Sequence, residues 1–283
     1  MIQNCRMVLS CPDRPGIVSR VSSLLYQHSA NIREAQQFND VEAGRFFMRV
    51  VFDCPGNLST IQTTLIDLGD ELDMDLVTRE VVHRKRVLIM VSKLDHCLGD
   101  LLYRYRIGEL AMDVIGIISN HPKEVLNVTT AGNIPYHFLP VSSGDRAAQE
   151  AQIQRIVDET DAELLVLARY MQILSDDLAE HLAGRCVNIH HSFLPGFKGA
   201  RPYHQAYARG VKMIGATAHF VTGNLDEGPI IAQDVEQITH ADTPEKLVVK
   251  GRDIERRVLS RAVSWILDDR VILNGNRTVV FEN

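Results

Sequence analysis

Residues 86–92 read RVLIMVS, an apolar run in which polar and hydrophobic side chains do not alternate. Such a run is typical of a parallel strand that is buried on both faces of a sheet. After it, stretches of helical periodicity alternate with short apolar runs as far as CVNIH at 186–190. The alternation predicts an α/β domain built on a doubly wound, mostly parallel sheet.

The elements expected in this domain follow from the periodicity of each segment. Helices are expected at 97–110, from about 121, at 145–160 and at 175–184, and strands at 113–120, 136–141, 162–169 and 186–190. Two further β segments, 214–222 and 229–238, precede a long helix at 243–269. Thr243 as the N-cap and Pro244 at the first helical position are typical of such a helix start.

The chain before residue 86 is organised differently. Its apolar spacing predicts strands at 5–11, 31–40, 45–54 and 74–82, with helices at 15–30 and 57–73. The order βαββαβ favours a small ferredoxin-like domain. The basic stretch HRKR at 83–86 is interpreted as a solvated hinge, so we predict two domains, 1–84 and 85–283.

Composition excludes several classes of function. A formal net charge of -6 argues against nucleic-acid binding, which needs a basic surface to displace counterions from phosphates. The five cysteines are scattered without a C-x-x-C pair, as in proteins of a reducing compartment. No apolar run approaches the roughly 20 residues that span a bilayer, and the N-terminus has no signal-peptide pattern. We therefore expect a cytoplasmic protein without a membrane partner.

The end of the strand at 186–190 carries polar side chains that suit carbonyl chemistry. Alternation along a strand directs Asn188 and His190 to one side and His191 to the other. An amide can donate to a developing oxyanion, and an imidazole can move a proton near neutral pH. No metal-ligand spacing is present, so no metal is expected. Taken alone, the pair is also compatible with an ordinary polar strand end.

A carboxylate in a second segment strengthens the catalytic interpretation. Asp226 lies between two β segments, where Gly228 and Pro229 predict a tight turn. A carboxylate held at such a turn can enter a cleft. The alternative is an Asx-type turn, in which Asp226 satisfies only local backbone amides.

The N-terminal segment DRPGIVSRVSSLLYQHSANI resembles the opening of ACT domains. In that family the loop after the first strand and the start of the first helix hold a small amino-acid effector. The resemblance implies effector binding at Asp13, Arg14, Pro15 and Gly16. Free amides at a helix N-terminus can capture a carboxylate. The alternative is an ordinary helix start in a domain that only mediates assembly.

Three segments of the second domain resemble the formyltransferase family that uses 10-formyltetrahydrofolate. NIHHSFLPGFKG and HFVTGNLDEGPI match two of its motifs, and the resemblance makes Asn188, His190 and Asp226 the catalytic trio. LVLARYMQILS at 165–175 is similar to the family's folate pocket. The substrate-binding residues implied there and at the turn are Tyr170, Met171, Gln172, Ile173, Leu174 and Gly228. Lys198, Gly199 and Arg201 fall in the loop after the first motif, where folate or its glutamate tail could pass.

The acceptor of the formyl group distinguishes branches of this family. In glycinamide ribonucleotide formyltransferases a G-x-G-S-N loop cradles the acceptor's phosphate. Here the corresponding stretch reads SKLDH at 92–96, without those glycines and with an acid at Asp95 that would repel a phosphate. With no evident acceptor pocket, water is the simplest nucleophile, and the whole chain resembles the formyltetrahydrofolate deformylase family.

That resemblance implies hydrolysis of 10-formyltetrahydrofolate to formate and tetrahydrofolate, which supplies formate to purine synthesis and balances one-carbon pools. It implies no cofactor and no metal, with Asp226 as base or water-positioning group, Asn188 as oxyanion donor and His190 as charge stabiliser or proton donor. It also implies a homo-oligomer and an effector that is glycine or methionine. The alternatives are a formyl transferase with a small amine acceptor and a non-catalytic folate or amino-acid sensor.

Overall fold

The computed structural model describes residues 2–128, 133–141, 146–196 and 202–282, which form two compact units. The chain up to His83 makes most of the first unit, and Arg84–Leu267 makes most of the second. The C-terminal part is divided: Asp268–Asn274 and the residues from Val279 onward group with the first unit. The sequence had assigned all of 85–283 to the second domain.

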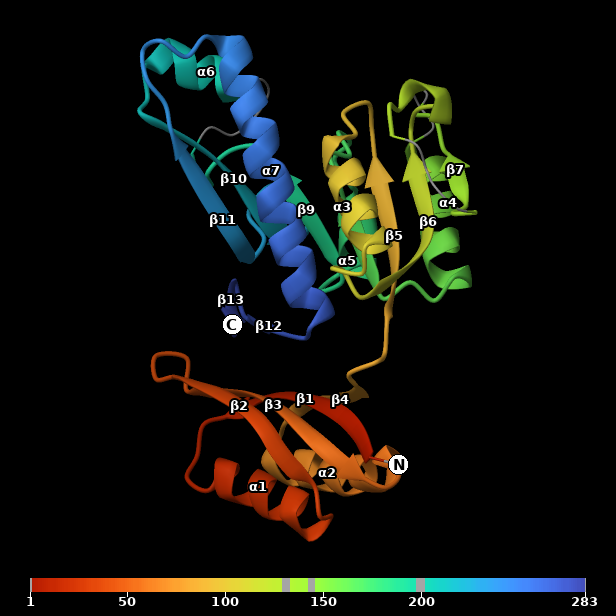
Figure 1. The fold of residues 1–283 in the computed structure, drawn as a ribbon, viewed down its shortest axis with the longest axis vertical. Helices are drawn as coiled ribbons and strands as arrows, with labels where there is room; N and C mark the ends of the chain where they lie inside the picture. Colours follow the sequence, from red (N-terminus) through yellow and green to blue (C-terminus); the bar gives the residue numbers. More distant parts are fainter. Residues whose placement is uncertain (1, 129–132, 142–145, 197–201, 283) are drawn as a thin grey trace. The chain divides into compact units, whose positions relative to one another are not determined.

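The first unit contains a four-stranded antiparallel sheet with the strand order β2-β3-β1-β4 (Figure 1). Its elements are β1 (Ile2–Pro12), α1 (Ile17–Gln27), β2 (Asn31–Asp40), β3 (Arg45–Pro55), α2 (Leu58–Leu72) and β4 (Asp75–Glu80). The order βαββαβ confirms the predicted ferredoxin-like fold.

Both helices of this unit pack through apolar stripes that the sequence spacing predicts. Val21 and Leu25 of α1 and Ile61 and Leu65 of α2 are buried in one core with the sheet. The Asn57 side chain caps α2 by accepting a hydrogen bond from the Ser59 amide at 3.0 Å. Local capping and apolar periodicity therefore agree in this unit.

The C-terminal segment adds a second layer to the first unit. Phe47 of β3 packs against Phe281 in a separate buried cluster. Asp268, directly after the last helix, forms ion pairs with the buried side chains of Arg6 and Arg49. Burying two arginines is costly without a partner, so this carboxylate stabilises the contact.

The second unit contains a seven-stranded sheet with the order β11-β10-β9-β8-β5-β6-β7. Its strands are β5 (Lys85–Val91), β6 (Met112–Ser119), β7 (Tyr136–Phe138), β8 (Leu164–Leu167), β9 (Cys186–His190), β10 (Met213–Phe220) and β11 (Ile230–Gln237). β5 to β9 run parallel, while β10 pairs antiparallel with both neighbours. The predicted doubly wound, mostly parallel sheet is confirmed.

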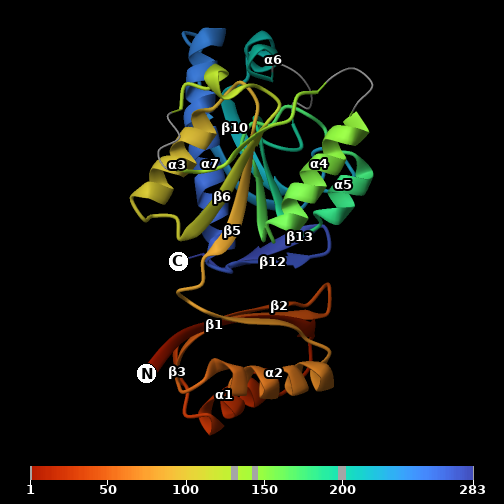
Figure 2. The same ribbon diagram turned by 90° about the vertical axis from the view of Figure 1, so that its right-hand side faces the viewer.

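Helices cover both faces of this sheet, as Figure 2 shows. One face carries α3 (His96–Arg106) and α7 (Pro244–Leu267), and the other carries α4 (Arg146–Glu159) and α5 (Asp176–His181). α6 (Pro202–Arg209) precedes β10, and β12 (Val271–Asn274) pairs with β13 (Arg277–Val280) near the C-terminus. Two-sided cover explains why β5 is apolar at consecutive positions.

The long helix α7 is the element that later shapes the functional site. It has 24 residues, and the Thr243 hydroxyl accepts a hydrogen bond from the Lys246 amide at 3.4 Å. A Cβ on Gly251 would lie 2.1 Å from the ring of Tyr203, so only glycine lets this ring approach the helix. Across the described residues, α7 included, we find no helix with the length and apolar character needed to cross a membrane.

The helix that we expected from about residue 121 is replaced by a short 3₁₀ turn, Lys123–Val125. After this turn, the amides of Asn127 and Val128 donate to the Asp95 carboxylate at 2.5 and 3.0 Å. A carboxylate thus takes the amides that a continuing helix would have used. The sequence prediction was wrong here because the competing acceptor lies about thirty positions earlier in the chain.

Candidate active site

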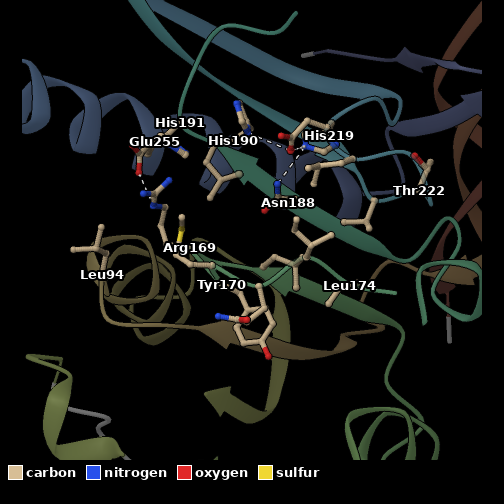
Figure 3. A pocket seen from close by; sticks show the side chains of 18 of the residues that line it. Leu94, Arg169, Tyr170, Leu174, Asn188, His190, His191, His219, Thr222 and Glu255 are labelled. Carbon is tan, nitrogen blue, oxygen red and sulfur yellow. Dashed lines mark hydrogen bonds and ion pairs between the residues drawn. The ribbon is translucent and has the colours of Figure 1, made fainter. Parts of the chain in front are cut away.

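A cavity of about 640 Å³ opens at the carboxyl ends of β5, β8 and β9. In doubly wound sheets this edge is where ligands bind. Asn188, His190 and Asp226, the predicted catalytic trio, all line the cavity. Figure 3 shows Asn188 and His190 between two sets of side chains with different chemistry.

The two sets define two halves of the cavity. We call the first the apolar half; it consists of Met171, Ile173, Leu174, Val221 and Leu225. We call the second the polar half; it consists of His96, Arg169, His191, Tyr203 and Glu255. In Figure 3, Arg169 and Glu255 lie on one side of Asn188, and Leu174 lies on the other.

The predicted catalytic trio is joined by short contacts. Asp226 Oδ1 lies 3.2 Å from His190 Nδ1. Asn188, on the same side of β9, places its amide nitrogen 3.2 Å from His219 Nε2. Asp226 has a positive φ of 57°, a turn conformation that Asp tolerates, and this turn directs its carboxylate toward the strand end. Asp226 is therefore not only an Asx-turn residue that satisfies local backbone amides, because its carboxylate contacts a side chain from another element.

His219 fixes the orientation of the Asn188 amide, and the sequence did not single it out. His219 Nδ1 lies 2.9 Å from the Phe220 carbonyl oxygen, which can only accept, so Nδ1 carries the hydrogen. Nε2 is then the acceptor for an Asn188 N–H. Burial lowers the pKa of His219 and keeps it neutral in this role. The signal was present in the motif HFVTGNLDEGPI, whose first residue is His219.

The carboxylate of Asp226 stays ionised near neutral pH. Burial alone would raise the pKa of this carboxyl, but the hydrogen bond and charge of His190 outweigh it and lower the pKa. His190 Nε2, on the far side of the ring from this contact, is buried and has no hydrogen-bond partner among the described residues. In the His190–Asp226 pair, Nε2 of the imidazole is therefore available for a hydrogen bond to a ligand or to water.

His191 lies in the same cavity as His190, contrary to the prediction that it faces the other way. β9 ends at His190, so strand alternation no longer governs the next residue. The two imidazole rings lie 5.1 Å apart, centroid to centroid. Burial, followed by the charges of Arg169 and His190, lowers the pKa of His191 to about 3.

The predicted folate-binding residues Tyr170, Met171, Gln172, Ile173 and Leu174 all line the cavity. Met171 and Ile173 are 53% and 58% exposed. Large apolar side chains that stay open to solvent inside a cleft are typical of a surface that receives a flat apolar ligand.

Ser92, at the end of β5, holds this segment in place. Its hydroxyl accepts a hydrogen bond from the Met171 amide at 3.0 Å and donates to Asn120 Oδ1 at 2.8 Å. Its own amide donates to the Arg169 carbonyl at 3.2 Å. The sequence grouped Ser92 with the altered loop and did not predict this positioning contact.

Gly228 is placed differently from the other predicted substrate-binding residues. It does not line the cavity; a Cβ at this position would lie 1.8 Å from the Phe220 carbonyl oxygen. Glycine is needed here for close approach of the turn to the end of β10, next to His219. Its contribution is to the shape of the turn that carries Asp226.

The polar half contains a buried hydrogen-bonded network that sequence reasoning missed. Glu255 of α7 accepts from the Tyr203 hydroxyl at 2.6 Å and lies 2.8 Å from His96 Nε2 and 3.4 Å from Arg169 Nε. Its partners come from distant parts of the chain. A usable signal was the helical spacing of Gly251, Glu255 and Val258, which puts a carboxylate on the buried stripe of α7.

His96, Cys97 and Glu255 are the described residues whose ligand atoms cluster closely enough to consider a metal ion. The chemistry of the set does not fit one. Both Glu255 oxygens already have donors, and the Arg169 guanidinium lies beside them. Burial, with the charge of Glu255, raises the pKa of Cys97 well above its usual value, so it stays a thiol rather than a thiolate ligand.

The predicted effector residues lie at the exposed start of α1 in the first unit. Asp13 accepts a hydrogen bond from Asn39 at 2.7 Å, and Arg14 donates to the Leu72 carbonyl at 3.2 Å. Gly16 is the N-cap residue with a φ of 92°, and Pro15 precedes it. Lys198, Gly199 and Arg201 lie outside the described residues.

Comparisons with known proteins agree with both units. Residues 85–263 match the model of the formyl transferase family, and residues 6–80 match that of the ACT domain. The chain is 49% identical over 277 residues to formyltetrahydrofolate deformylase of Corynebacterium sp. (strain P-1), covering 97% of this chain and 96% of the relative. Identity to the Bacillus subtilis (strain 168) enzyme of that name is 47% over 280 residues, 98% and 93% of the two chains.

Solved structures give the same result. Formyltetrahydrofolate deformylase from Burkholderia mallei ATCC 23344 superposes with a TM-score of 0.95 at 47% identity, covering 99% of this chain and 100% of that one. Glycinamide ribonucleotide transformylase 1 from Symbiobacterium toebii gives a TM-score of 0.65 at 29% identity, covering 71% and 95%.

Proposed function

The chain belongs to the formyltetrahydrofolate deformylase family, and we propose that its cleft hydrolyses 10-formyltetrahydrofolate through Asn188, His190 and Asp226. The observation that carries these assignments is the contact geometry of the trio at the carboxyl edge of the sheet. The products are formate and tetrahydrofolate.

The apolar half receives the pteridine and the adjoining aryl ring of the substrate. Its exposed side chains lose contact with water when a flat ring covers them, which favours binding. The backbone groups of Gln172 and Leu174 make no hydrogen bond with other described residues and are free to pair with the polar edge of the ring. Such pairing orients the formyl group toward the trio.

Water attacks the formyl carbon, and the amide of Asn188 donates to the oxygen that becomes negative. His219 already fixes one N–H of this amide, so the second N–H is preorganised for the oxyanion. Because no side chain has to reorient as charge develops, the hydrogen bond is strongest in the tetrahedral intermediate.

His190 moves the proton. With Nδ1 held by the Asp226 carboxylate, Nε2 takes a proton from the attacking water and returns it to N10 as the carbon–nitrogen bond breaks. Sequence reasoning favoured Asp226 as the base. Its lowered pKa makes it a weak base, and its contact with His190 suits it better to orient and stabilise the imidazolium.

The loop after β5 supports water rather than a phosphorylated amine as the acceptor. Asp95 directs its carboxylate to the amides of Asn127 and Val128. This places a negative charge in the loop at 92–96, where the related transferases cradle a phosphate, and the charge would repel one. Hydrolysis needs no such phosphate site.

The first unit supports regulation. We assign an amino-acid effector, glycine or methionine, to the start of α1 at Asp13 to Gly16, and self-association to the same domain. The five cysteines are buried and free, which is the usage of a reducing compartment, and we place the protein in the cytoplasm.

The test is to incubate the purified protein with 10-formyltetrahydrofolate in buffer alone and to follow formate and tetrahydrofolate together. We expect equal release of both, and loss of both in Asp226→Asn. Turnover that begins only when an amine acceptor such as glycinamide ribonucleotide is added would reject hydrolysis in favour of transfer. Binding without turnover under either condition would indicate a sensor.

A further inference from the structure

The polar half of the cleft differs from a typical amine-binding pocket because its carboxylate, Glu255, already has hydrogen-bond and ion-pair partners in the protein. Glu255 is almost completely buried; its two oxygens hydrogen-bond with Tyr203 and His96, and one of them forms an ion pair with Arg169 at 3.4 Å. Burial alone would raise the pKa of Glu255, but these donors outweigh it and lower the pKa. Glu255 is therefore an ionised group that neither accepts a further proton nor recognises an incoming ammonium.

Two buried nitrogens of Arg169, Nε and Nη1, lack a hydrogen-bond partner within the described residues, and His191 is the other member of the polar half without a hydrogen bond there. Neither of its ring nitrogens hydrogen-bonds to another residue in the described parts of the chain. Its ring is held by packing instead, 5.1 Å from the His190 centroid and 6.3 Å from that of Tyr203. The ring thus has a defined place beside the catalytic histidine, with its polar atoms available to the cavity.

The charge state of His191 suits it to binding water. Its pKa of about 3 leaves the imidazole neutral at physiological pH, with one N–H donor and one acceptor nitrogen. A neutral ring can accept a hydrogen bond from a water molecule and leave the oxygen lone pairs available for attack. A protonated ring could only donate, which would make the same water a poorer nucleophile.

From these contacts we propose that His191 binds the water molecule that attacks the formyl carbon, in a polar half that Arg169 and Glu255 close to amine acceptors. This inference rests on the proposed hydrolytic function. The water donates one hydrogen bond to His191 and loses its other proton to His190 Nε2. Its oxygen bonds to the formyl carbon, the bond to N10 breaks, and N10 receives the proton from His190.

The test is the variant His191→Phe, which keeps a ring against His190 and Tyr203 but removes both nitrogens. We expect kcat to fall on the order of 10- to 100-fold, below the full effect of a proton-transfer group, because the water is less well held. KM should change by less than about threefold, because the folate side of the cleft is intact. His191→Asn, which keeps an acceptor, should recover part of kcat.

An experiment with a competing nucleophile distinguishes water binding by His191 from a purely structural effect of the substitution. In the presence of hydroxylamine, each turnover ends in formate or in formohydroxamate, and tetrahydrofolate forms in both cases. If His191 holds water, His191→Phe should raise the share of formohydroxamate, while a matched His204→Phe variant of the same cavity should not. Tetrahydrofolate binding and thermal unfolding report whether each variant is folded.

Two results would overturn the inference: a His191→Phe enzyme with wild-type kcat, or one with lowered kcat and unchanged product partition. Neither result would affect the proposed function, which depends on formate release by the wild-type protein in buffer alone. The two failures are therefore distinguishable.

Discussion

The two halves of the cleft differ in how far their interactions are complete before a ligand binds. The apolar half leaves Met171 and Ile173 more than half exposed, so its interactions are completed only when a ligand arrives. In the polar half, Arg169, Tyr203 and Glu255 are buried, and hydrogen bonds form around Glu255 before any ligand is present. The difference indicates that one half supplies binding energy and the other supplies a fixed electrostatic environment, which is the part that must not reorganise during reaction.

Removing Glu255 should produce the largest effect and should appear in stability. Glu255→Ala leaves the buried guanidinium of Arg169 without its carboxylate, and breaking a buried pair in this way costs about 3–5 kcal/mol. Urea unfolding of the variant and the wild type measures this loss. The matched control is Glu245→Ala, an exposed carboxylate in the first turn of the same helix, which should cost at most about 1 kcal/mol.

Equal losses of unfolding free energy in Glu255→Ala and Glu245→Ala would contradict the distinction between a preformed polar half and an apolar half that is completed by the ligand. Glu255 would then be an ordinary helix residue whose contacts contribute little. The polar half would not be a preformed environment.

The next effect should appear in catalysis without a comparable change in stability. Asn188→Ala removes the oxyanion donor that His219 holds, and the loss of one such donor typically lowers kcat about 100- to 1000-fold. Steady-state hydrolysis of 10-formyltetrahydrofolate measures it. Asn224→Ala is the control, because it removes an exposed amide that lines the same cavity and makes no hydrogen bond with the trio, and it should change kcat little. Near-wild-type turnover of Asn188→Ala would exclude its assigned role.

The place of the proposed catalytic trio in one cavity could be predicted from the sequence because each member lies in a short local pattern. Asn188 and His190 end an apolar strand, and Asp226 lies in a turn marked by Gly228 and Pro229. The sheet order then brings the two segments together, since β9 and β10 are neighbours and pair Asn188 with His219. Local pattern and topology were sufficient here.

The Glu255 network could not be predicted in the same way. Its members lie at the start of α3, just after β8, on α6 and on α7, and only tertiary packing brings them together. The C-terminal segment behaves likewise: besides the nearby Arg270, Asp268 pairs with Arg6 and Arg49, more than 200 positions away in the chain. Charges whose partners are this distant leave no periodic signal.

A change in the apolar half should affect binding and leave stability unchanged. Ile173→Ala removes apolar surface that only a bound ligand covers, so KM should rise by about five- to tenfold, or about 1–1.5 kcal/mol. The unfolding free energy should stay within about 0.5 kcal/mol of wild type, because the side chain is exposed in the free protein. Steady-state kinetics and urea unfolding check the two halves of this prediction.

Ile66→Ala provides the control for exposure alone. Ile66, on α2, has the same exposed fraction as Ile173, 58%, but lies outside the cleft. Its KM should match that of the wild type. A rise in KM for both variants would mean that exposure, not position in the cleft, explains the effect.

The smallest effect concerns pH and returns to the polar half. The pKa of His191 is about 3 in the folded protein and near 6.5 in an unfolded chain. Between these values the unfolded chain binds a proton that the folded protein does not, so stability falls as the pH drops below 6.5. At about pH 5.5 this amounts to about 1 kcal/mol.

The variant His191→Phe tests this contribution. Because it has no imidazole at this position, its unfolding free energy should decline less than that of the wild type between about pH 7 and about pH 5.5. His219, whose pKa is also lowered, adds a loss of the same sign to both proteins, and the difference between them therefore isolates His191. Identical declines would show that His191 is protonated as readily in the folded state as in the unfolded one, and the polar half would then not hold a neutral imidazole for water.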